Sequence, residues 1–391
     1  MFRFGQESKE NIRQEIEQLT PANTRKSKSS IWRQFTNFCA EKSYNFDRAD
    51  VPVEELALIL EDYGFNMRKK NSEDYKESVI KVLWNSTAKQ LQEYFFEKYN
   101  RKFNPFSDIE FLNARAAKNA KRRKLQRDPT KRKESSSALS IDEVRKIIEL
   151  WDENTPEGLQ KKFFHVAAHE LAWRGNEGAA AQLEYFVEEI DNRGEPTGRI
   201  EYNTVFSKTT QGGSKKMADS KWLVPNTLNE EICPVRLFKK LTSKRGSIKT
   251  KRLFLTPNPN WKNPSSKGWY KDSPVGQNTI SSWLKSAASL IGIDVKKIKI
   301  TNHSARATAV STLAKTGIGE QELIKITGHG SSHSIKPYLQ IDSGHHREII
   351  NAMRSASTSA KTIQESLNQK QATTSNEPAI LLELTTSGRK L

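Results

Sequence analysis

A run of basic residues divides the chain and limits how it can fold. Residues 118–137 read KNAKRRKLQRDPTKRKESSS and hold nine Lys or Arg, two acidic residues and one Pro. A segment of this composition buries too little apolar surface to be a core element, so it predicts a basic linker. The chain is then expected to fold as separate domains on either side, and its 391 residues suffice for two or three.

Apolar periodicity predicts a helical domain before this linker. Across residues 24–117, large side chains recur at helical spacing, as at Trp32, Phe35 and Phe38. The core of an ordinary helical bundle accounts for nearly all of them. Residues 1–23 are expected to form a flexible N-terminus.

Residues 138–354 predict a second domain of mixed structure. Ser140 and Glu143 form an S-x-x-E capping box at its start. Strands are expected at 199–206, 221–225 and 248–255, with a turn at Gly212-Gly213, and helices at 279–291, 305–316 and 320–327. The expected fold class is mainly α with one small antiparallel β-sheet (α+β), followed by a Ser/Thr-rich tail over residues 355–391.

The charge balance indicates a polyanionic partner. The 64 Lys and Arg exceed the 46 Asp and Glu, which gives a formal net charge of +18. Within the basic run, Lys121, Arg122, Arg123 and Lys124 are the candidate residues for binding such a partner, although a solvated linker or a nuclear import signal has the same composition. No apolar window is long enough to span a membrane, the start has no apolar signal region, and two cysteines cannot build a disulfide framework, so an intracellular protein is expected.

The most informative spacing lies in residues 302–338. His303 and Arg306 are three residues apart on one helical face, Gly328-His329 ends a later helix, and Tyr338 stands nine residues after His329. Each element alone has an ordinary explanation: a surface pair, a helix C-cap, a packed aromatic ring. A metal site at Asp342, His345 and His346 is not predicted, because suitably placed partners are missing.

The joint spacing resembles the tyrosine recombinases, the phage-integrase family. The segment HELAWRGNEGAAAQLEYF (169–186) resembles the first box of that family, with Arg174 followed by Glu177. The family box usually reads Thr-Gly-Leu-Arg, whereas this chain has Leu171-Ala172-Trp173-Arg174. The KTTQGG (208–213), CPVRLF (233–238) and WY…PVGQN (269–278) segments look most like the Crypton-type recombinases of eukaryotic mobile elements.

The resemblance implies a reaction in which Tyr338 attacks a DNA phosphate and forms a 3′-phosphotyrosyl ester, which keeps the energy of the broken bond. By the same resemblance, His303 assists as a base and His329 donates to the scissile phosphate. Arg174 and Arg306 would neutralise the charge that develops on phosphate oxygens, since guanidinium stays charged at any working pH.

Two supporting roles also follow from the resemblance. Glu177 would orient Arg174, and a hairpin lysine would protonate the departing 5′-oxygen. Lys208, Lys215 and Lys216 are available, and Lys208 is preferred because it stands at the strand end, ahead of the Gly-Gly turn. Fixed positive charges would stabilise the transition state, so no cofactor or metal is expected.

The sequence thus predicts a site-specific recombinase or integrase of a mobile element. Its expected partners are double-stranded DNA and further copies of itself, as a dimer to tetramer, and its expected location is the nucleus if the source is eukaryotic. Two alternatives stay open: a type IB topoisomerase, which uses similar residues, and a domesticated DNA-binding protein without catalysis.

Overall fold

The computed structural model describes residues 5, 7–132, 134–203, 221–263, 265, 268–338, 346–347 and 350–355. They form two compact units: unit 1 comprises the described parts of 1–137 together with 293–300, and unit 2 comprises those of 138–203, 219–292 and 301–355. None of the helices in these ranges is long and apolar enough to cross a membrane.

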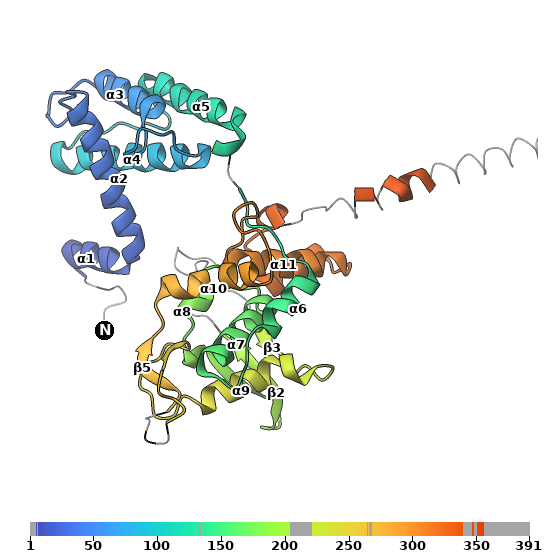
Figure 1. Ribbon diagram of the computed structural model, residues 1–391. Coiled ribbons are helices and arrows are strands. Elements are labelled where there is room, and N and C mark those ends of the chain that lie inside the picture. Colours follow the sequence, from blue (N-terminus) through green and yellow to red (C-terminus); the bar gives the residue numbers. More distant parts are fainter. Residues whose placement is uncertain are drawn as a thin grey trace, which may run out of the picture. The chain divides into compact units, whose positions relative to one another are not determined.

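Unit 1 is a helical bundle around an aromatic core (Figure 1). Its helices are α1 (Lys9–Leu19), α2 (Ala22–Glu41), α3 (Val53–Asn66), α4 (Glu77–Tyr99) and α5 (Leu112–Arg127), with short 3-10 turns η1 (Ile109–Phe111) and η2 (Pro129–Lys131). Phe35, Tyr63 and Phe95 are fully buried, as is Trp84, whose indole N–H donates to Leu60 O at 3.0 Å. Because the indole N–H keeps a hydrogen-bond partner, the large ring fills the core without leaving a buried donor unpaired.

Helix α5 corrects the expected linker over 118–137. The basic run is helical up to Arg127, and the helix packs against α3 and α4. Lys121 is buried, with its ammonium 2.6 Å from an Asp74 carboxylate oxygen, and Arg122 Nε donates to Glu77 at 2.6 Å. The composition of the run predicted that it would be exposed to solvent. In the structure, Asp74 and Glu77 neutralise the charges of Lys121 and Arg122, and the buried Leu125 supplies an apolar contact.

The N-terminus also differs from the expected flexible segment over 1–23. Ser8 accepts a hydrogen bond from Asn11 N at 3.1 Å and so caps α1, whose Ile12, Ile16 and Leu19 side chains are exposed. The helix has no buried residue. Its order therefore comes from local capping and helix propensity rather than from core packing.

Unit 2 places helices around α7 (Figure 1). Its helices are α6 (Ile141–Glu149), α7 (Pro156–Glu170), α8 (Glu177–Ala180), α9 (Pro234–Ser243), α10 (Gln277–Leu290), α11 (Asn302–Lys315) and α12 (Glu320–Thr327), with 3-10 turns η3 (Leu183–Tyr185), η4 (Glu230–Ile232), η5 (Ser332–Ser334) and η6 (Lys336–Tyr338). The predicted Ser140–Glu143 capping box is present at the start of α6. Helix α7 is buried along most of its length and contacts α6, α9 and α11.

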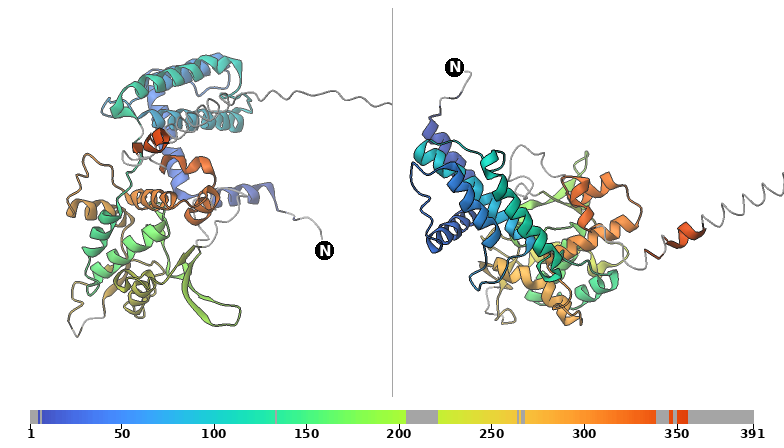
Figure 2. Two further views of the ribbon diagram at one scale, coloured as in Figure 1. Left: turned by 90° about the vertical axis from the view of Figure 1, so that its right-hand side faces the viewer. Right: turned by 90° about the horizontal axis from the view of Figure 1, so that it is seen from above.

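Two small antiparallel sheets accompany these helices. Strands β1 (Phe186–Ile190), β2 (Pro196–Tyr202) and β3 (Lys221–Leu223) form one in that order, and β4 (Leu255–Pro257) pairs with β5 (Tyr270–Pro274) in the other; Figure 2 shows β1 and β2 extending from unit 2 as a ribbon. The mainly α class with small antiparallel structure is confirmed. The second, two-stranded sheet was not predicted: the expected strand at 248–255 overlaps β4 only at Leu255, and β4 pairs with β5.

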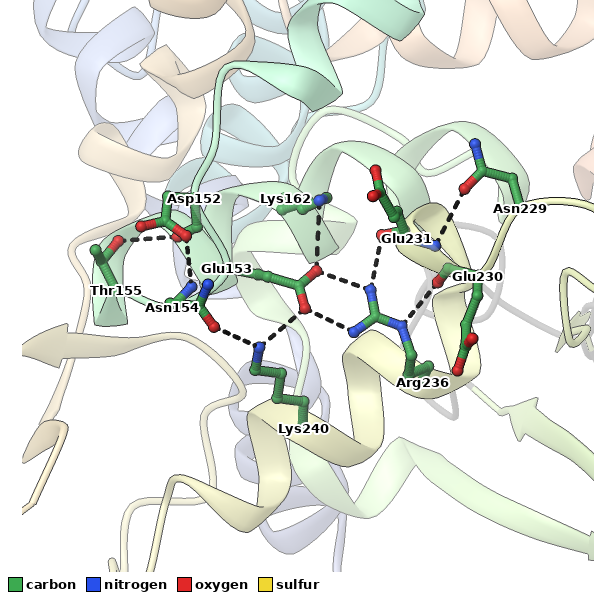
Figure 3. A network of polar contacts seen from close by, with 10 residues as sticks. All are labelled: Asp152, Glu153, Asn154, Thr155, Lys162, Asn229, Glu230, Glu231, Arg236 and Lys240. Carbon is green, nitrogen blue, oxygen red and sulfur yellow. Dashed lines mark hydrogen bonds and ion pairs between the residues drawn. The ribbon is translucent and has the colours of Figure 1, made fainter.

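A charged cluster joins the α6–α7 connection to α9 (Figure 3). Arg236 donates to both carboxylate oxygens of Glu153, at 2.6 and 2.7 Å, and Lys240 adds a contact at 2.9 Å. Lys162 lies 3.4 Å from the same carboxylate. The Arg236 hydrogen bonds lower the pKa of Glu153 despite its partial burial, so the carboxylate stays charged and holds three cations in place.

Two histidines, one buried and one half-buried, lie one turn apart on α7. His165 and His169 line the same small cavity, about 10 Å³, together with Leu139, Ile147 and Leu284. His165 Nε2 and His169 Nδ1 are buried, and neither has a hydrogen-bond partner among the residues that the structure describes. Burial lowers their pKa values to about 3 and about 4, so both rings are neutral near pH 7.

These histidines predict acid-sensitive folding. Their pKa values rise to about 6.5 on unfolding, so below that pH the unfolded chain binds up to two more protons and stability falls by up to about 2.7 kcal/mol per pH unit. Replacing both His165 and His169 by Leu should flatten this loss, measured by urea unfolding between about pH 7.5 and about pH 5. Exposed His333→Gln is the matched control, and an unchanged slope in the double variant would contradict the assignment.

Candidate active site

A strained turn after α7 presents Arg174. Ala172 adopts φ +46°, a left-handed conformation, and Trp173 N donates to Ala168 O across the helix end. Such a conformation costs a residue with a Cβ about 1–2 kcal/mol, which explains why glycine is usual at this place in the resembling family box. Leu171 and Trp173 are buried on either side and hold the turn.

Arg174 is fixed by an acid and a main-chain carbonyl. Its Nη1 lies 2.7 Å from Glu177 Oε1, while its main-chain N–H donates to Glu177 Oε2 at 2.8 Å. Its Nη2 donates to Gly328 O, at the end of α12. Burial raises the pKa of Glu177, but the Arg174 charge and hydrogen bonds outweigh it and lower the pKa overall, so this is a charged pair. Glu177 therefore holds the Arg174 guanidinium in place.

Arg306 reaches the same turn from α11. It is 1 % exposed, and its Nη1 donates to Ala172 O at 2.6 Å. Its Nη2 is buried and has no hydrogen-bond partner among the described residues. Burial and the nearby Arg174 charge lower the pKa of Arg306 to about 10, although Glu177 and Tyr338 act in the opposite direction. The guanidinium stays charged. Its Nη1 is held by Ala172 O, and its Nη2 can donate to a bound anion.

His329 follows α12, where Gly328 takes a left-handed conformation and ends the helix. Thr327 Oγ1 donates its single proton to Leu323 O at 2.6 Å, so it accepts from His329 Nδ1 at 2.6 Å. This network assigns the neutral ring a proton on Nδ1 and leaves Nε2 as an acceptor. Burial, then the charges of the three cations Arg306, Arg174 and Lys221, lower the pKa of His329 to about 3.

His303 lies at the start of α11, where Thr301 caps the helix. The ring is exposed and packs against Gly175, directly after Arg174. A Cβ at position 175 would stand 2.9 Å from His303 Nε2, closer than such atoms approach. A side chain at position 175 would push this exposed ring aside, so glycine lets the imidazole lie over the Arg174 turn.

Tyr338 ends the short turn η6 beside these groups. Its main-chain N–H donates to Ile335 O at 2.8 Å, and Ser311 Oγ donates to Tyr338 O at 2.7 Å. The half-buried ring packs on a small cluster that includes Val310 and Ile335, and its centroid lies 5.3 Å from that of His329. The turn is thus anchored to α11, and the phenol belongs to the same cluster as the two arginines.

The predicted Lys208 lies outside the described residues, as do Lys215 and Lys216. The structure instead brings Lys221, the first residue of β3, into the cluster: its Nζ donates to Leu171 O, and to Thr327 O at 3.3 Å. Sequence analysis missed it. The alternation of the strand predicted at 221–225 could have indicated it, because this alternation puts Lys221 on the same face as the buried Leu223.

The assembled site can bind and activate a phosphate diester. Two guanidiniums, two imidazoles and a phenol converge from the ends of α7, α11 and α12 and from η6. The structure thus brings together five of the predicted residues: Arg174, His303, Arg306, His329 and Tyr338. Among the described residues, no group of three or more His, Cys, Asp or Glu side chains could hold a metal. The candidate DNA-binding residues 121–124 belong to unit 1 and are not part of this cluster.

Comparison with solved structures identifies the fold. The Tn1549 transposon integrase in complex with a circular intermediate DNA matches 85 % of this chain and 94 % of its own at 13 % identity and TM-score 0.51. The same integrase with transposon right end DNA matches 86 % and 95 % at 15 % identity and TM-score 0.50. This chain has the tyrosine-recombinase fold. The XerH site-specific recombinase bound to difH, in a post-cleavage complex, matches 78 % and 73 % at 13 % identity and TM-score 0.49. No protein-family model and no curated protein matches the sequence.

Within the tyrosine-recombinase fold, the cluster comes from segments far apart in the chain. Arg174 follows α7, Arg306 lies within α11, and His329 and Tyr338 follow α12. At 13–15 % identity, the similarity extends to the fold, and the chemistry of the site depends on this chain's own residues.

Proposed function

We propose that this protein is a site-specific DNA recombinase that cleaves and rejoins DNA through a phosphotyrosine at Tyr338. One observation carries the proposal: Arg306 Nη2 and His329 Nε2 are both buried and lack partners among the described residues, beside the Tyr338 phenol. Buried polar groups without partners are costly, and two that face a nucleophile fit the non-bridging oxygens of a phosphate.

Each residue then has a stated role. Arg174 and Arg306 neutralise charge on the phosphate oxygens, and Glu177 keeps Arg174 in its orientation. His329 donates from Nε2 once it is doubly protonated, which the phosphate anion favours by offsetting the neighbouring cations. Exposed His303 receives the phenolic proton of Tyr338, and the ester that forms keeps the energy needed for rejoining.

The biological setting is the finer part of the proposal. The Crypton-like segments noted in the sequence support a mobile-element recombinase that acts in a eukaryotic nucleus. The Tn1549 integrase, with which this chain shares its fold, is seen with transposon right end DNA, which agrees with movement of an element. Joining two duplexes needs several active sites, so a homodimer to homotetramer on DNA is expected.

The direct test traps the covalent intermediate. Nicked duplexes cut from DNA of the source organism are incubated with the full chain, stopped in SDS, and the DNA that stays attached is sequenced. An adduct on a recurring sequence, together with products that join two duplexes, supports the recombinase. Adducts without joined duplexes indicate the topoisomerase alternative, and binding with no adduct indicates the catalytically silent DNA-binding protein.

The ion pairs of α5 indicate which of residues 121–124 should make DNA binding depend on salt. Arg123 and Lys124 are exposed, whereas Lys121 and Arg122 are held by Asp74 and Glu77. Replacing Arg123 and Lys124 by Ala should flatten the log–log salt slope of DNA binding by about 2, at roughly 0.9 per phosphate contact.

Lys121→Ala is the matched control for this measurement. It should leave the slope unchanged and lower the stability of unit 1 by up to about 3 kcal/mol, because Asp74 loses its buried partner. The result that would contradict this assignment is a flatter slope for Lys121→Ala than for the exposed pair.

A further inference from the structure

One stretch of unit 2 carries many cations and no acid. Residues 232–271 hold eleven Lys or Arg and neither Asp nor Glu. They supply α9, β4 and the start of β5. Such a concentration of like charge indicates a polyanionic partner wherever the cations are not already neutralised by acids from elsewhere in the chain.

Acids from other segments neutralise some of these cations. Glu153, Glu184 and Glu188 form ion pairs at 2.6–3.1 Å with Arg236, Lys239, Lys240 and Lys251. Arg245 is buried and, like Arg252, donates to main-chain carbonyls, while Lys267 lies outside the described residues. Four lysines are exposed and form no ion pair with any residue that the structure describes: Lys244, Lys249, Lys262 and Lys271.

Two tryptophans fix the first pair of these exposed lysines. The Lys244 ammonium lies over the Trp269 ring, 4.8 Å from its centroid, and the Lys262 ammonium lies 5.4 Å from the centroid of Trp261. The two rings contact each other, with centroids 5.2 Å apart. An ammonium held on an indole keeps its charge and has lost part of its freedom before a partner arrives. The end of α9 and the β4–β5 connection therefore present their lysines together.

The second pair of exposed lysines lies beside β5. Lys271 belongs to this strand, and the Lys249 main-chain N–H donates to Asp272 Oδ2 at 3.3 Å. The same carboxylate accepts from the Thr250 main-chain N–H at 2.9 Å, which ties the 249–250 segment to the strand. Trp269 directly precedes β5, so the two pairs share one surface. We call it the β5 basic surface, which consists of Lys244, Lys249, Lys262 and Lys271.

The β5 basic surface and the candidate active site lie at opposite ends of α7. The Tyr270 hydroxyl donates at 2.9 Å to the main-chain oxygen of Pro156, the first residue of this helix. Arg174 follows the last residue, Glu170. The 15 residues of α7 rise 1.5 Å each, which makes the helix about 22 Å long. A phosphate bound at Arg174 is therefore beyond the reach of the lysines beside β5.

We propose that the β5 basic surface binds the phosphates of a duplex DNA segment other than the one in the candidate active site. The inference rests on the proposed function, which brings DNA to this protein. Lysine binds phosphate as a point charge and makes no base contacts here, so this binding is independent of sequence. Trp261 and Trp269 are engaged by each other and by lysines, rather than open for base stacking, which favours duplex over single-stranded DNA.

A capture experiment tests for the second duplex. The full chain is bound at saturation to an immobilised nicked duplex, and a labelled, unnicked duplex of unrelated sequence is then added. A variant with Gln at all four lysines of the β5 basic surface should capture at least about tenfold less label, with a log–log salt slope flatter by about 3 to 4, at roughly 0.9 per phosphate contact. Its adduct formation on the nicked duplex should match that of the unmodified protein.

Two double variants separate this surface from general charge and from misfolding. Lys249→Gln with Lys271→Gln leaves both lysine–tryptophan contacts in place and should flatten the slope by about 2. Lys146→Gln with Lys161→Gln removes the same charge from α6 and α7, where Lys161 lies over Trp151 and pairs with Glu157, and should leave capture unchanged. Equal loss in both double variants would overturn the proposal. Full capture by the four-lysine variant would also overturn it, because the active site of another copy would then hold the second duplex.

Further arms identify the source of the bound phosphates. If the surface holds a flank of the cleaved duplex, the four-lysine variant should lose affinity for a long nicked duplex and keep it for a short one, which also supports the proposal. Surface-dependent binding of poly-glutamate without capture of any duplex would indicate an acidic protein segment and overturn it. If the unmodified protein captures the second duplex but forms no adduct, the proposed function fails and the DNA-binding surface stands.

Discussion

Tyr338→Phe should abolish the covalent protein–DNA adduct and leave DNA affinity within about twofold. Only the nucleophilic oxygen is removed, and the ring keeps its packing on Ile335 and Val310. The main-chain contacts of the turn, from Tyr338 N to Ile335 O and from Ser311 Oγ to Tyr338 O, are also unaffected. The measurement is an SDS-stable adduct on a nicked duplex, alongside binding under native conditions.

Tyr270→Phe provides the control for this loss. Tyr270 is a buried tyrosine of the same unit, and its hydroxyl donates to Pro156 O at 2.9 Å. Its removal should cost about 1 kcal/mol of stability and leave the adduct in place. An adduct formed by Tyr338→Phe at the rate of the unmodified protein would show that another residue is the nucleophile.

Arg306→Lys should slow cleavage by about 10²- to 10³-fold although the positive charge remains. A guanidinium can donate to Ala172 O with one edge and to a phosphate with the other, whereas an ammonium on a shorter side chain cannot span both. The expected loss is therefore in the rate of adduct formation at saturating DNA, measured in a single turnover.

Arg245→Lys controls for the general effect of this substitution. Arg245 is also buried in unit 2, and its Nη1 donates to Arg252 O and Leu253 O at 2.8 and 2.9 Å. Among the residues that the structure describes, it has no contact with those of the candidate site, so its variant should lose stability and keep the rate. If both variants slow cleavage equally, the Arg306 effect is structural, and its role at the phosphate is wrong.

The charged residues of α5 show where composition misleads. Nine basic residues in 20 positions predicted a linker, yet Lys121 and Arg122 meet acidic side chains about 45 positions earlier in the chain. Composition reports the average environment of a segment. It does not reveal a partner that only folding brings near, so the exposed Arg123 and Lys124 could not be distinguished from their ion-paired neighbours.

The sequence by itself determined the nature of the candidate site. The order and spacing of Arg174, His303, Arg306, His329 and Tyr338 resembled the tyrosine recombinases, and that resemblance implied phosphate chemistry. It could be recognised without a structure because residue types and spacing are read directly from the chain. The helix at 320–327, the Ser140 capping box and the mainly α class were likewise local properties, set by periodicity and capping.

Only the tertiary structure decided how these groups are held. Two carbonyls, Leu171 O and Thr327 O, become acceptors for Lys221 because the ends of α7 and α12 meet in space. The tautomer of His329 depends on Thr327 and on its contact to Leu323 in the preceding helical turn. Helix ends expose main-chain groups at positions that periodicity can locate, but which side chain reaches them is fixed by packing between segments distant in sequence.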